Sequence, residues 1–232
     1  MKVEAGSTGR AAQRHTVTSR DVEILKWITR CRFATTEQVQ VRFGLKRSKA
    51  FQRLGVLATE GLVKRENVLH RQPGAHRVTR KGLAMLGTDM PVPTIGLQSF
   101  LHDQAVVWEQ VNLELSGCET ITEREMRYSE RALGEAYTVR IPPSQSAGAV
   151  THLPDLAFRM KGLWYAVEVE LAPKSEARLS SILLGYLAEP RYDTVVYCVP
   201  TQQLITRVTA IGAKLGLGDH LKVVVVRQPA AA

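Results

Sequence analysis

The sequence is poor in cysteine and has no long apolar run. Its three cysteines, Cys31, Cys118 and Cys198, lie far apart and form no C-x-x-C pair, so neither a disulfide framework nor a zinc site is expected. Apolar runs are short, such as the four valines at 223–226, against the roughly 20 residues that span a bilayer. The N-terminal segment has basic residues but no apolar signal-peptide core, so we expect a soluble, cytoplasmic protein without a membrane partner.

Motifs of several common enzyme classes are missing as well. The chain has no G-x-S-x-G, no P-loop lysine motif and no G-x-G-x-x-G linked to a strand. A nucleotide-dependent or nicotinamide-dependent enzyme is therefore disfavoured.

The composition is that of a folded protein with an uneven distribution of charge. The 232 residues are 44% hydrophobic and 23% charged, and this length favours two domains. From Met1 to Gly87, 18 lysines and arginines stand against 6 aspartates and glutamates, a balance of +12. From Thr88 to Ala232 the counts are 13 and 16, a balance of −3. An N-terminal half this basic is typical of nucleic-acid binding.

The N-terminal half predicts three successive helices. Thr18 caps a first helix that ends near Arg30, and Thr35 caps a second helix that ends at Gly44. The third helix covers about residues 47–60 and ends before a glycine. Its expected apolar stripe consists of Ala50, Leu54, Leu57 and Ala58.

A hairpin and a short helix follow. Two strand-like runs, residues 62–70 and 75–79, flank a turn with Arg71 near its tip, and residues 79–87 predict a closing helix. The order helix, helix, helix, hairpin, helix resembles a winged helix-turn-helix domain over residues 17–87. In that class the third helix enters the major groove of DNA. Base contacts are expected from Gln52 and Arg53, and phosphate contacts from Arg47, Lys49, Lys64, Arg65, Arg71 and Arg77. A winged helix that binds protein is the alternative.

The second half predicts another domain, for a fold class of α/β (α+β overall). Residues 88–98 are the expected linker, because they contain two prolines in a polar context, and residues 99–227 form the second domain. A helix over 99–116 has one apolar side, made of Leu101, Ala105, Trp108, Val111 and Leu115. Strands are expected at 120–129, 154–160, 163–171, 193–199 and 221–226, helices at 175–190 and 202–216, and an exposed loop at 141–149. The ends, 1–16 and 228–232, are expected to be flexible.

Two glutamates share one face of an apolar strand in this half. Side chains alternate along a strand, so Glu168 and Glu170 point to the same side, which either is wet or holds a cation. A Pro-Asp pair places Asp155 at the start of the preceding strand. This pattern across a hairpin resembles the PD-(D/E)XK nuclease-like fold.

That resemblance implies a divalent metal site. Asp155 and Glu168 match the metal ligands of the fold, and Glu170 takes the position of its usual lysine, so the implied metal set is Asp155, Glu168 and Glu170. Three carboxylates suit a hard cation such as Mg²⁺. Lys174 is the ammonium expected to replace the missing lysine, and with the carboxylates it completes the implied catalytic set.

A domain that has lost cleavage is the alternative for this half. Its carboxylates would be exposed or paired with Arg159, Arg178 or Lys174. His152 is then a loop residue and not a ligand, and Tyr186 is a core residue or lines the same cleft.

The chain as a whole resembles the replication-relaxation family of actinobacterial plasmids and mobile elements. The resemblance rests on TSRDVEILKWITRCRFATTEQV in the first half and on FLHDQAVVWEQVNLEL, LPDLAF, VEVEL and LSSILLGYLAEP in the second. It covers about residues 17–199 and implies a role in the maintenance of plasmid or mobile-element DNA.

Three hypotheses remain open at this point. The first is a double-stranded DNA-binding protein of a plasmid, phage or integrative element, acting as a regulator or replication-associated factor. The second is an Mg²⁺-dependent endonuclease or nickase targeted by the winged helix, and the third is a protein-protein adaptor with a degenerate nuclease fold. Candidate protein partners are a second copy of the chain and replication or transfer proteins.

Overall fold

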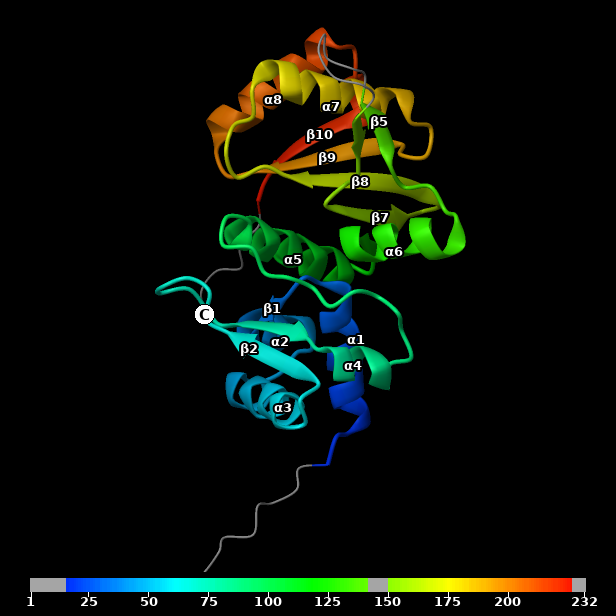
Figure 1. Cartoon of the computed structure of the whole chain (residues 1–232). Helices are drawn as coiled ribbons and strands as arrows, with labels where there is room; N and C mark the ends of the chain where they lie inside the picture. The colour runs from blue at the N-terminus through cyan, green and yellow to red at the C-terminus, as the bar shows by residue number, and fades with distance from the viewer. Residues whose placement is uncertain (1–15, 142–149, 227–232) are drawn as a thin grey trace, which may run out of the picture.

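The computed structural model describes residues 16–141 and 150–226, and its fold is mixed α/β (Figure 1). The first part consists of α1 (Ser19–Arg30), β1 (Ala34–Thr35), α2 (Thr36–Arg42), α3 (Arg47–Thr59), β2 (Val63–Glu66), β3 (Ala75–Val78), α4 (Arg80–Met85) and α5 (Phe100–Leu115). The second part consists of β4 (Glu119–Thr122), α6 (Glu123–Leu133), β5 (Val139–Ile141), β6 (Val150–His152), β7 (Leu156–Met160), β8 (Leu163–Val169), α7 (Glu176–Ala188), β9 (Thr194–Val199), α8 (Gln202–Lys214), η1 (Gly218–His220) and β10 (Leu221–Val225). The two ends expected to be flexible and the loop expected at 141–149 lie almost entirely outside the described residues.

Reciprocal side-chain caps determine where the first two helices begin. The Thr18 hydroxyl accepts from the backbone N–H of Asp21, and the Asp21 carboxylate accepts from the backbone N–H of Thr18 at 2.8 Å. Thr35 and Gln38 form the same pair of bonds at α2. Each box satisfies N–H groups that a helix start leaves without partners. Both predicted helix starts are confirmed.

The N-terminal part adds a small sheet to its helices. β2 and β3 form the expected antiparallel hairpin, and β1 pairs with β3, giving the strand order β1-β3-β2. On α3 the prediction is wrong at one position, because Ala58 is exposed and Val56 is buried. At 100° per residue, these two positions lie on opposite sides of Leu57, so the buried face of α3 is rotated toward Val56.

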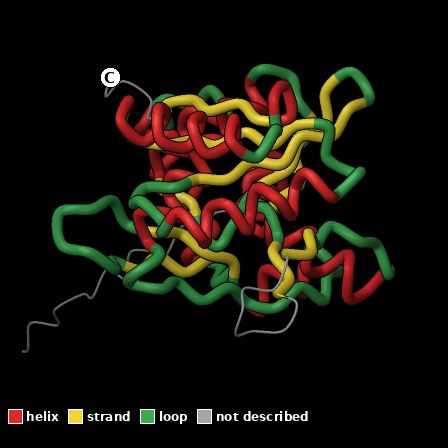
Figure 2. Tube along the Cα trace, turned by 90° about the horizontal axis from the view of Figure 1, so that it is seen from above, coloured by secondary structure: helices red, strands yellow, loops and turns green. Residues whose placement is uncertain are grey.

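A five-stranded sheet forms the centre of the second part, with the order β10-β9-β8-β7-β4. β8, β9 and β10 are parallel, whereas β7 is antiparallel to both neighbours. α7 and α8 cover one face and α5 covers the other, which gives the layers seen in Figure 1. Figure 2 shows these helices (red) and strands (yellow) packed together from above, with loops (green) extending outward. The β7–β8 turn is at the predicted Lys161 and Gly162, both with positive φ.

One predicted strand is partly a helix. The prediction extended a strand over 120–129, but β4 ends at Thr122 and α6 begins at once. Thr122 and Glu125 form a third capping box, in which the Glu125 carboxylate accepts from the N–H of Thr122 at 2.9 Å. This Thr-x-x-Glu signal outweighs the alternating pattern that suggested a longer strand.

α5 serves both parts of the molecule. Val107, Trp108 and Val111 pack into the core of the N-terminal part, whereas Ala105 packs against the large sheet. Its expected apolar side is therefore correct only at its centre. Leu101 and Leu115, at the two ends of the predicted stripe, are 48% and 56% exposed. The expected linker is also anchored, because Met90 is buried in the N-terminal core.

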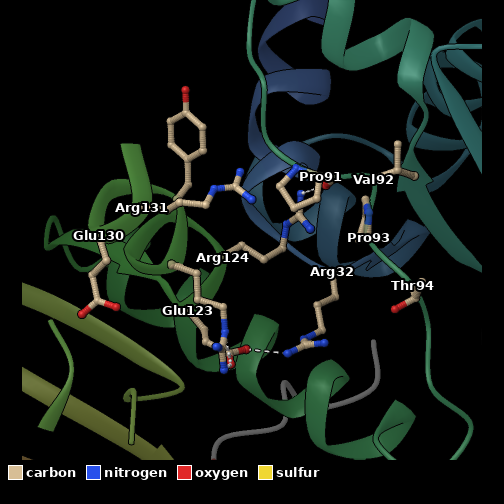
Figure 3. Close-up of a pocket in the computed structure, with 11 residues that line it drawn as sticks. Arg32, Pro91, Val92, Pro93, Thr94, Glu123, Arg124, Glu130 and Arg131 are labelled. Atoms are coloured by element: carbon tan, nitrogen blue, oxygen red, sulfur yellow. Dashed lines mark hydrogen bonds and ion pairs between the residues drawn. The ribbon is translucent and has the colours of Figure 1, made fainter. Parts of the chain in front are cut away.

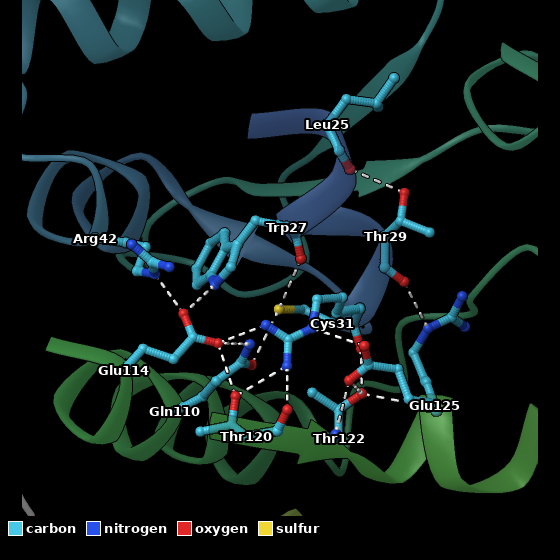
Figure 4. Close-up of polar contacts among 12 residues, drawn as sticks. Leu25, Trp27, Thr29, Cys31, Arg42, Gln110, Glu114, Thr120, Thr122 and Glu125 are labelled. Carbon is cyan, nitrogen blue, oxygen red and sulfur yellow. Dashed lines mark hydrogen bonds and ion pairs between the residues drawn. The ribbon is translucent and has the colours of Figure 1, made fainter. Parts of the chain in front are cut away.

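A buried carboxylate joins the two parts. Glu114 on α5 has a side chain that is only 5% exposed, and it pairs with Arg30 of α1 at 2.6 Å and with Arg42 of α2. Figure 4 shows this carboxylate among its donors. The other three donors are Trp27 at 2.9 Å, Gln110 at 2.9 Å and Thr120 at 2.8 Å. Arg30 continues the network to Glu125 of α6 at 2.7 Å.

Within residues 16–141 and 150–226, no helix is long and apolar enough to cross a membrane. Cys31, Cys118 and Cys198 form no disulfide, and two of them are buried. Burial raises the pKa of the Cys31 thiol, whose Sγ lies 3.5 Å from the carbonyl oxygen of Trp27. Cys31 is thus a packing residue of the N-terminal core.

Glu114→Gln should destabilise the protein by about 2 to 4 kcal/mol, because it leaves two partly buried guanidinium groups short of a negative charge. Urea unfolding measures this change. Glu176→Gln is the matched control, since its side chain is 62% exposed and pairs with Lys214 at 3.5 Å. We expect that control to stay within about 0.5 kcal/mol of the wild type. Equal effects of the two substitutions would contradict the role of Glu114.

Stability should also fall in acid, and Glu114 should carry part of this fall. Burial tends to raise the pKa of Glu114, but the charge of Arg30 and several hydrogen bonds outweigh burial and lower it. A lowered carboxyl pKa stabilises the fold above the ordinary value near 4.5, and this contribution is lost as the pH falls through the folded-state value. Unfolding followed from pH 7 to pH 3 should show a shallower loss for Glu114→Gln than for the wild type.

Candidate functional site

The exposed face of α3 carries the first candidate residues. Arg47, Lys49 and Gln52 are exposed, and the Lys49 ammonium donates to the Gln52 side chain at 3.0 Å. Phe51 is 45% exposed, and the Arg47 guanidinium lies 5.9 Å from its ring centroid. An exposed aromatic with an arginine over its ring is suited to contact bases and phosphates together. The sequence held no signal for Phe51, because at 100° per residue it lies beside Leu54 and Ala58 of the predicted apolar stripe.

Arg53 does not lie on this face, which corrects the expectation of a base contact. Its guanidinium pairs with the Asp21 carboxylate at 3.1 Å, and its side chain is only 16% exposed. Asp21 is fully buried and also caps α1 through Thr18. Removing Arg53 would leave a buried charge unpaired, so its role is to hold α3 against the start of α1.

The hairpin divides the expected phosphate-binding residues into two groups. Arg65 and Arg71 are exposed, and neither has an acidic partner among the described residues. Lys64 and Arg77 both pair with Glu66, at 3.2 and 2.7 Å, so their charge is partly compensated. Arg77 is also only 19% exposed. The phosphate contact of Arg77 stays a prediction, and in the structure its guanidinium links β3 to Glu66 of β2.

A cavity separates α3 from the hairpin. It measures about 440 Å³, and its lining includes Gln40 of α2, Arg47 and Phe51 of α3, and Arg65 and Asn67 of the hairpin. Arg47 of α3 and Arg65 of the hairpin thus line one depression, whose lining also includes Glu37 of α2. Asn67 and Gln40 had no signal in the sequence, because only the fold brings them to the same place.

Asp155 lies at the junction of the two parts, beside α5 and directly before β7 of the large sheet. Its Oδ2 accepts from the backbone N–H of Val169 at 2.9 Å and lies 3.2 Å from Nε2 of His102 on α5. His102 also has Asp103 at 3.7 Å. Hydrogen bonds from His102 to Asp103 and Asp155 raise the pKa of His102 to about 10, so its imidazole is charged at neutral pH.

Glu168 is buried between the sheet and α7. It is 2% exposed, accepts a hydrogen bond from the Tyr186 hydroxyl and lies 2.6 Å from Nε2 of His152. Burial lowers the pKa of His152, but the charge of Glu168 outweighs this and the pKa is raised. Tyr197 is the neighbour of Glu168 on β9, and its buried hydroxyl has no hydrogen-bond partner among the described residues.

Glu170 has a cation of its own. It is 3% exposed, and its carboxylate accepts from the backbone N–H and the ammonium of Lys174, each at 2.9 Å. The glutamate face of β8 is therefore not wet. Each glutamate has a basic side chain as its partner, and the contact with Lys174 is expected both for a domain that does not cleave and for a lysine that completes the implied catalytic set.

The three carboxylates gather at one end of the β7–β8 hairpin but face different partners, namely His102, His152 and Lys174. No group of three or more His, Cys, Asp or Glu side chains in the described part of the chain is arranged to hold a metal ion. As arranged, the residues do not form the Mg²⁺ site that the resemblance implied, since each carboxylate faces a histidine or lysine of the protein. Sequence reasoning missed His102, which lies 53 positions from Asp155.

Comparisons with known proteins add no relative. No protein-family model matches the chain, and no curated protein matches its sequence.

The pKa values of His102 and His76 should be shifted in opposite directions. At pH 7 we expect His102 to be charged and His76 to be neutral, because burial, followed by the charge of Arg65, lowers the pKa of His76 to about 4. The stabilising contribution of His102 is present below its ordinary pKa near 6.5 and is lost as the pH rises through about 10. Titration of the imidazole resonances by NMR measures both values.

Asp155→Asn is the matching variant for this titration. It should lower the pKa of His102 and leave that of His76 unchanged. A His102 that titrates near 6.5 in the wild type would contradict the arrangement of its pair.

Proposed function

We propose that the protein binds double-stranded DNA through α3 and the β2–β3 hairpin. The observation that carries this proposal is the set of exposed cations on α3 and the hairpin that have no acidic partner among the described residues, namely Arg47, Lys49, Arg65 and Arg71. Two of them, Arg47 and Arg65, line one depression. Charges left uncompensated in the folded protein attract a polyanion, and each phosphate contact releases counterions from DNA.

The order of elements supports the same proposal. Two helices precede α3, and a hairpin follows it, which is the layout of a winged helix-turn-helix domain. In that layout α3 is the recognition helix and the hairpin is the wing. Gln52 and Phe51 are then placed for base contacts, whereas the four unpaired cations serve the phosphates. The resemblance to the replication-relaxation family suggests a regulator or replication-associated factor on a plasmid or other mobile element.

Metal-dependent cleavage is not part of the proposal. A cation at Asp155, Glu168 and Glu170 would have to displace His102, His152 and Lys174 from their present partners. We assign the second part a supporting role instead, because α5 fixes it rigidly to the DNA-binding part through two cores.

Affinity for duplex DNA should fall steeply with salt, and single substitutions should flatten this dependence. Arg47→Ala and Arg71→Ala should each weaken binding and reduce the salt slope by about 1, as expected for one lost phosphate contact. Gln52→Ala should reduce the difference between specific and random duplexes. Fluorescence anisotropy at several salt concentrations measures these quantities.

Arg159→Ala on β7 is the control, because Arg159 is exposed and far in the fold from α3. It should bind DNA as the wild type does. Binding that does not depend on salt, or an equal loss in Arg159→Ala and Arg47→Ala, would overturn the proposed interface.

A further inference from the structure

A second cavity lies away from α3 and the hairpin. It measures about 670 Å³, within the range of sites for small ligands. Figure 3 shows it between α6, the segment 91–94 and Arg32, which follows α1. Its walls thus come from the N-terminal part, from the segment that connects the two parts, and from the second part.

The cavity has an excess of positive charge. Its arginines are Arg32, Arg124, Arg127 and Arg131, and its two carboxylates are Glu123 and Glu130. Glu123 is shared between Arg32 and Arg127, each at 2.6 Å. Glu130 instead accepts from the backbone N–H groups of Tyr137 and Thr138, at 2.7 and 2.6 Å. Two arginines therefore remain without a carboxylate partner in the described part of the chain, Arg124 and Arg131.

Arg124 is held in place by neutral groups. Its guanidinium donates to the carbonyl oxygens of Pro91 at 3.0 Å and Thr29 at 3.3 Å. Burial, with the charge of Arg32 as a further contribution, lowers the pKa of Arg124. A fixed guanidinium that faces a cavity and lacks a counterion is suited to bind phosphate oxygens.

The remaining wall is apolar. Pro91, Val92 and Pro93 line one side, and the ring of Tyr128 also borders the cavity. Pro93 is buried, and Tyr128 is partly buried against the N-terminal core, so this wall is firm. Prolines and an aromatic ring beside a cluster of arginines provide a surface for a planar base next to sites for phosphates.

We propose that this cavity binds a nucleoside di- or triphosphate. Arg124 and Arg131 bind the phosphates, and Pro91 and Tyr128 contact the base. Because the walls belong to both parts of the molecule, a bound nucleotide also stabilises their junction.

The experiment is calorimetric titration of the full chain with ATP, inorganic pyrophosphate and adenosine, each without added metal. ATP should bind, pyrophosphate should bind more weakly, and adenosine should bind weakest. Arg131→Gln should weaken ATP binding about tenfold or more, as expected for a lost bond to a charged group. Arg131 is exposed, so this variant tests the site without disturbing the junction. Arg124→Gln should weaken binding further, and Arg159→Gln is the matched control.

Four results would overturn the proposal. Absence of ATP binding at millimolar concentration would remove the site, as would ATP affinity that stays within twofold of the wild type in both Arg131→Gln and Arg124→Gln. Pyrophosphate that binds as tightly as ATP would contradict the proposed contact of Pro91 and Tyr128 with the base. Displacement of ATP by duplex DNA that depends on Arg131 would reassign the arginines to the DNA backbone. A failure of the proposed DNA interface can be distinguished from a failure of the nucleotide site. The DNA interface is tested by duplex binding of Arg47→Ala and Arg71→Ala, whereas the nucleotide site is tested by ATP binding of Arg131→Gln and Arg124→Gln.

Discussion

The arrangement of the two parts depends on one buried carboxylate. Glu114 is the acceptor at which α1, α2, α5 and the start of β4 meet, and its single negative charge is shared between Arg30 and Arg42 at the junction. Without that charge, Arg30 would have only Glu125 as a counterion, although its side chain is just 25% exposed. α5 is therefore more than a connection between domains. Its apolar residues pack into both cores. Its last turn supplies Glu114, the carboxylate that pairs with the partly buried guanidinium groups of Arg30 and Arg42 at the junction.

Local signals in the sequence predicted much of the fold. Thr18 and Thr35 identified helix starts, and Lys161-Gly162 identified a turn, because caps and tight turns depend on neighbouring residues alone. The same kind of signal was overlooked at Thr122, where an alternating pattern concealed a capping box. The residues needed for the correct prediction, Thr122 and Glu125, lie within four positions of each other, so the capping box should have been preferred to the alternating pattern.

The candidate sites were less predictable, because their residues are positioned by distant partners. Arg53 has the charge and helical position of a base-contacting residue, but Asp21, 32 positions away, turns it inward. Glu168 and Glu170 were correctly placed on one face, yet the partner of Glu168 comes from β6, which no alternation in β8 reveals. A pattern of carboxylates fixes which side chains are neighbours. It does not fix their counterions, and the counterions decide between a metal site and a set of ion pairs.

Ion pairs also connect the carboxylate region with the arginine-lined cavity. Asp155 contacts His102 at 3.2 Å, His102 lies 3.7 Å from Asp103, Asp103 lies 3.6 Å from Arg32, and Arg32 contacts Glu123 at 2.6 Å. Arg32 thus makes a short ion pair with Glu123 and a longer one with Asp103. An anion in the cavity would compete for Arg32, and weakening its contact with Asp103 would strengthen the hold of that carboxylate on His102. This series runs from α6 through Arg32, which follows α1, to α5 and the large sheet, so the cavity and the carboxylate region are connected by charged contacts across the junction.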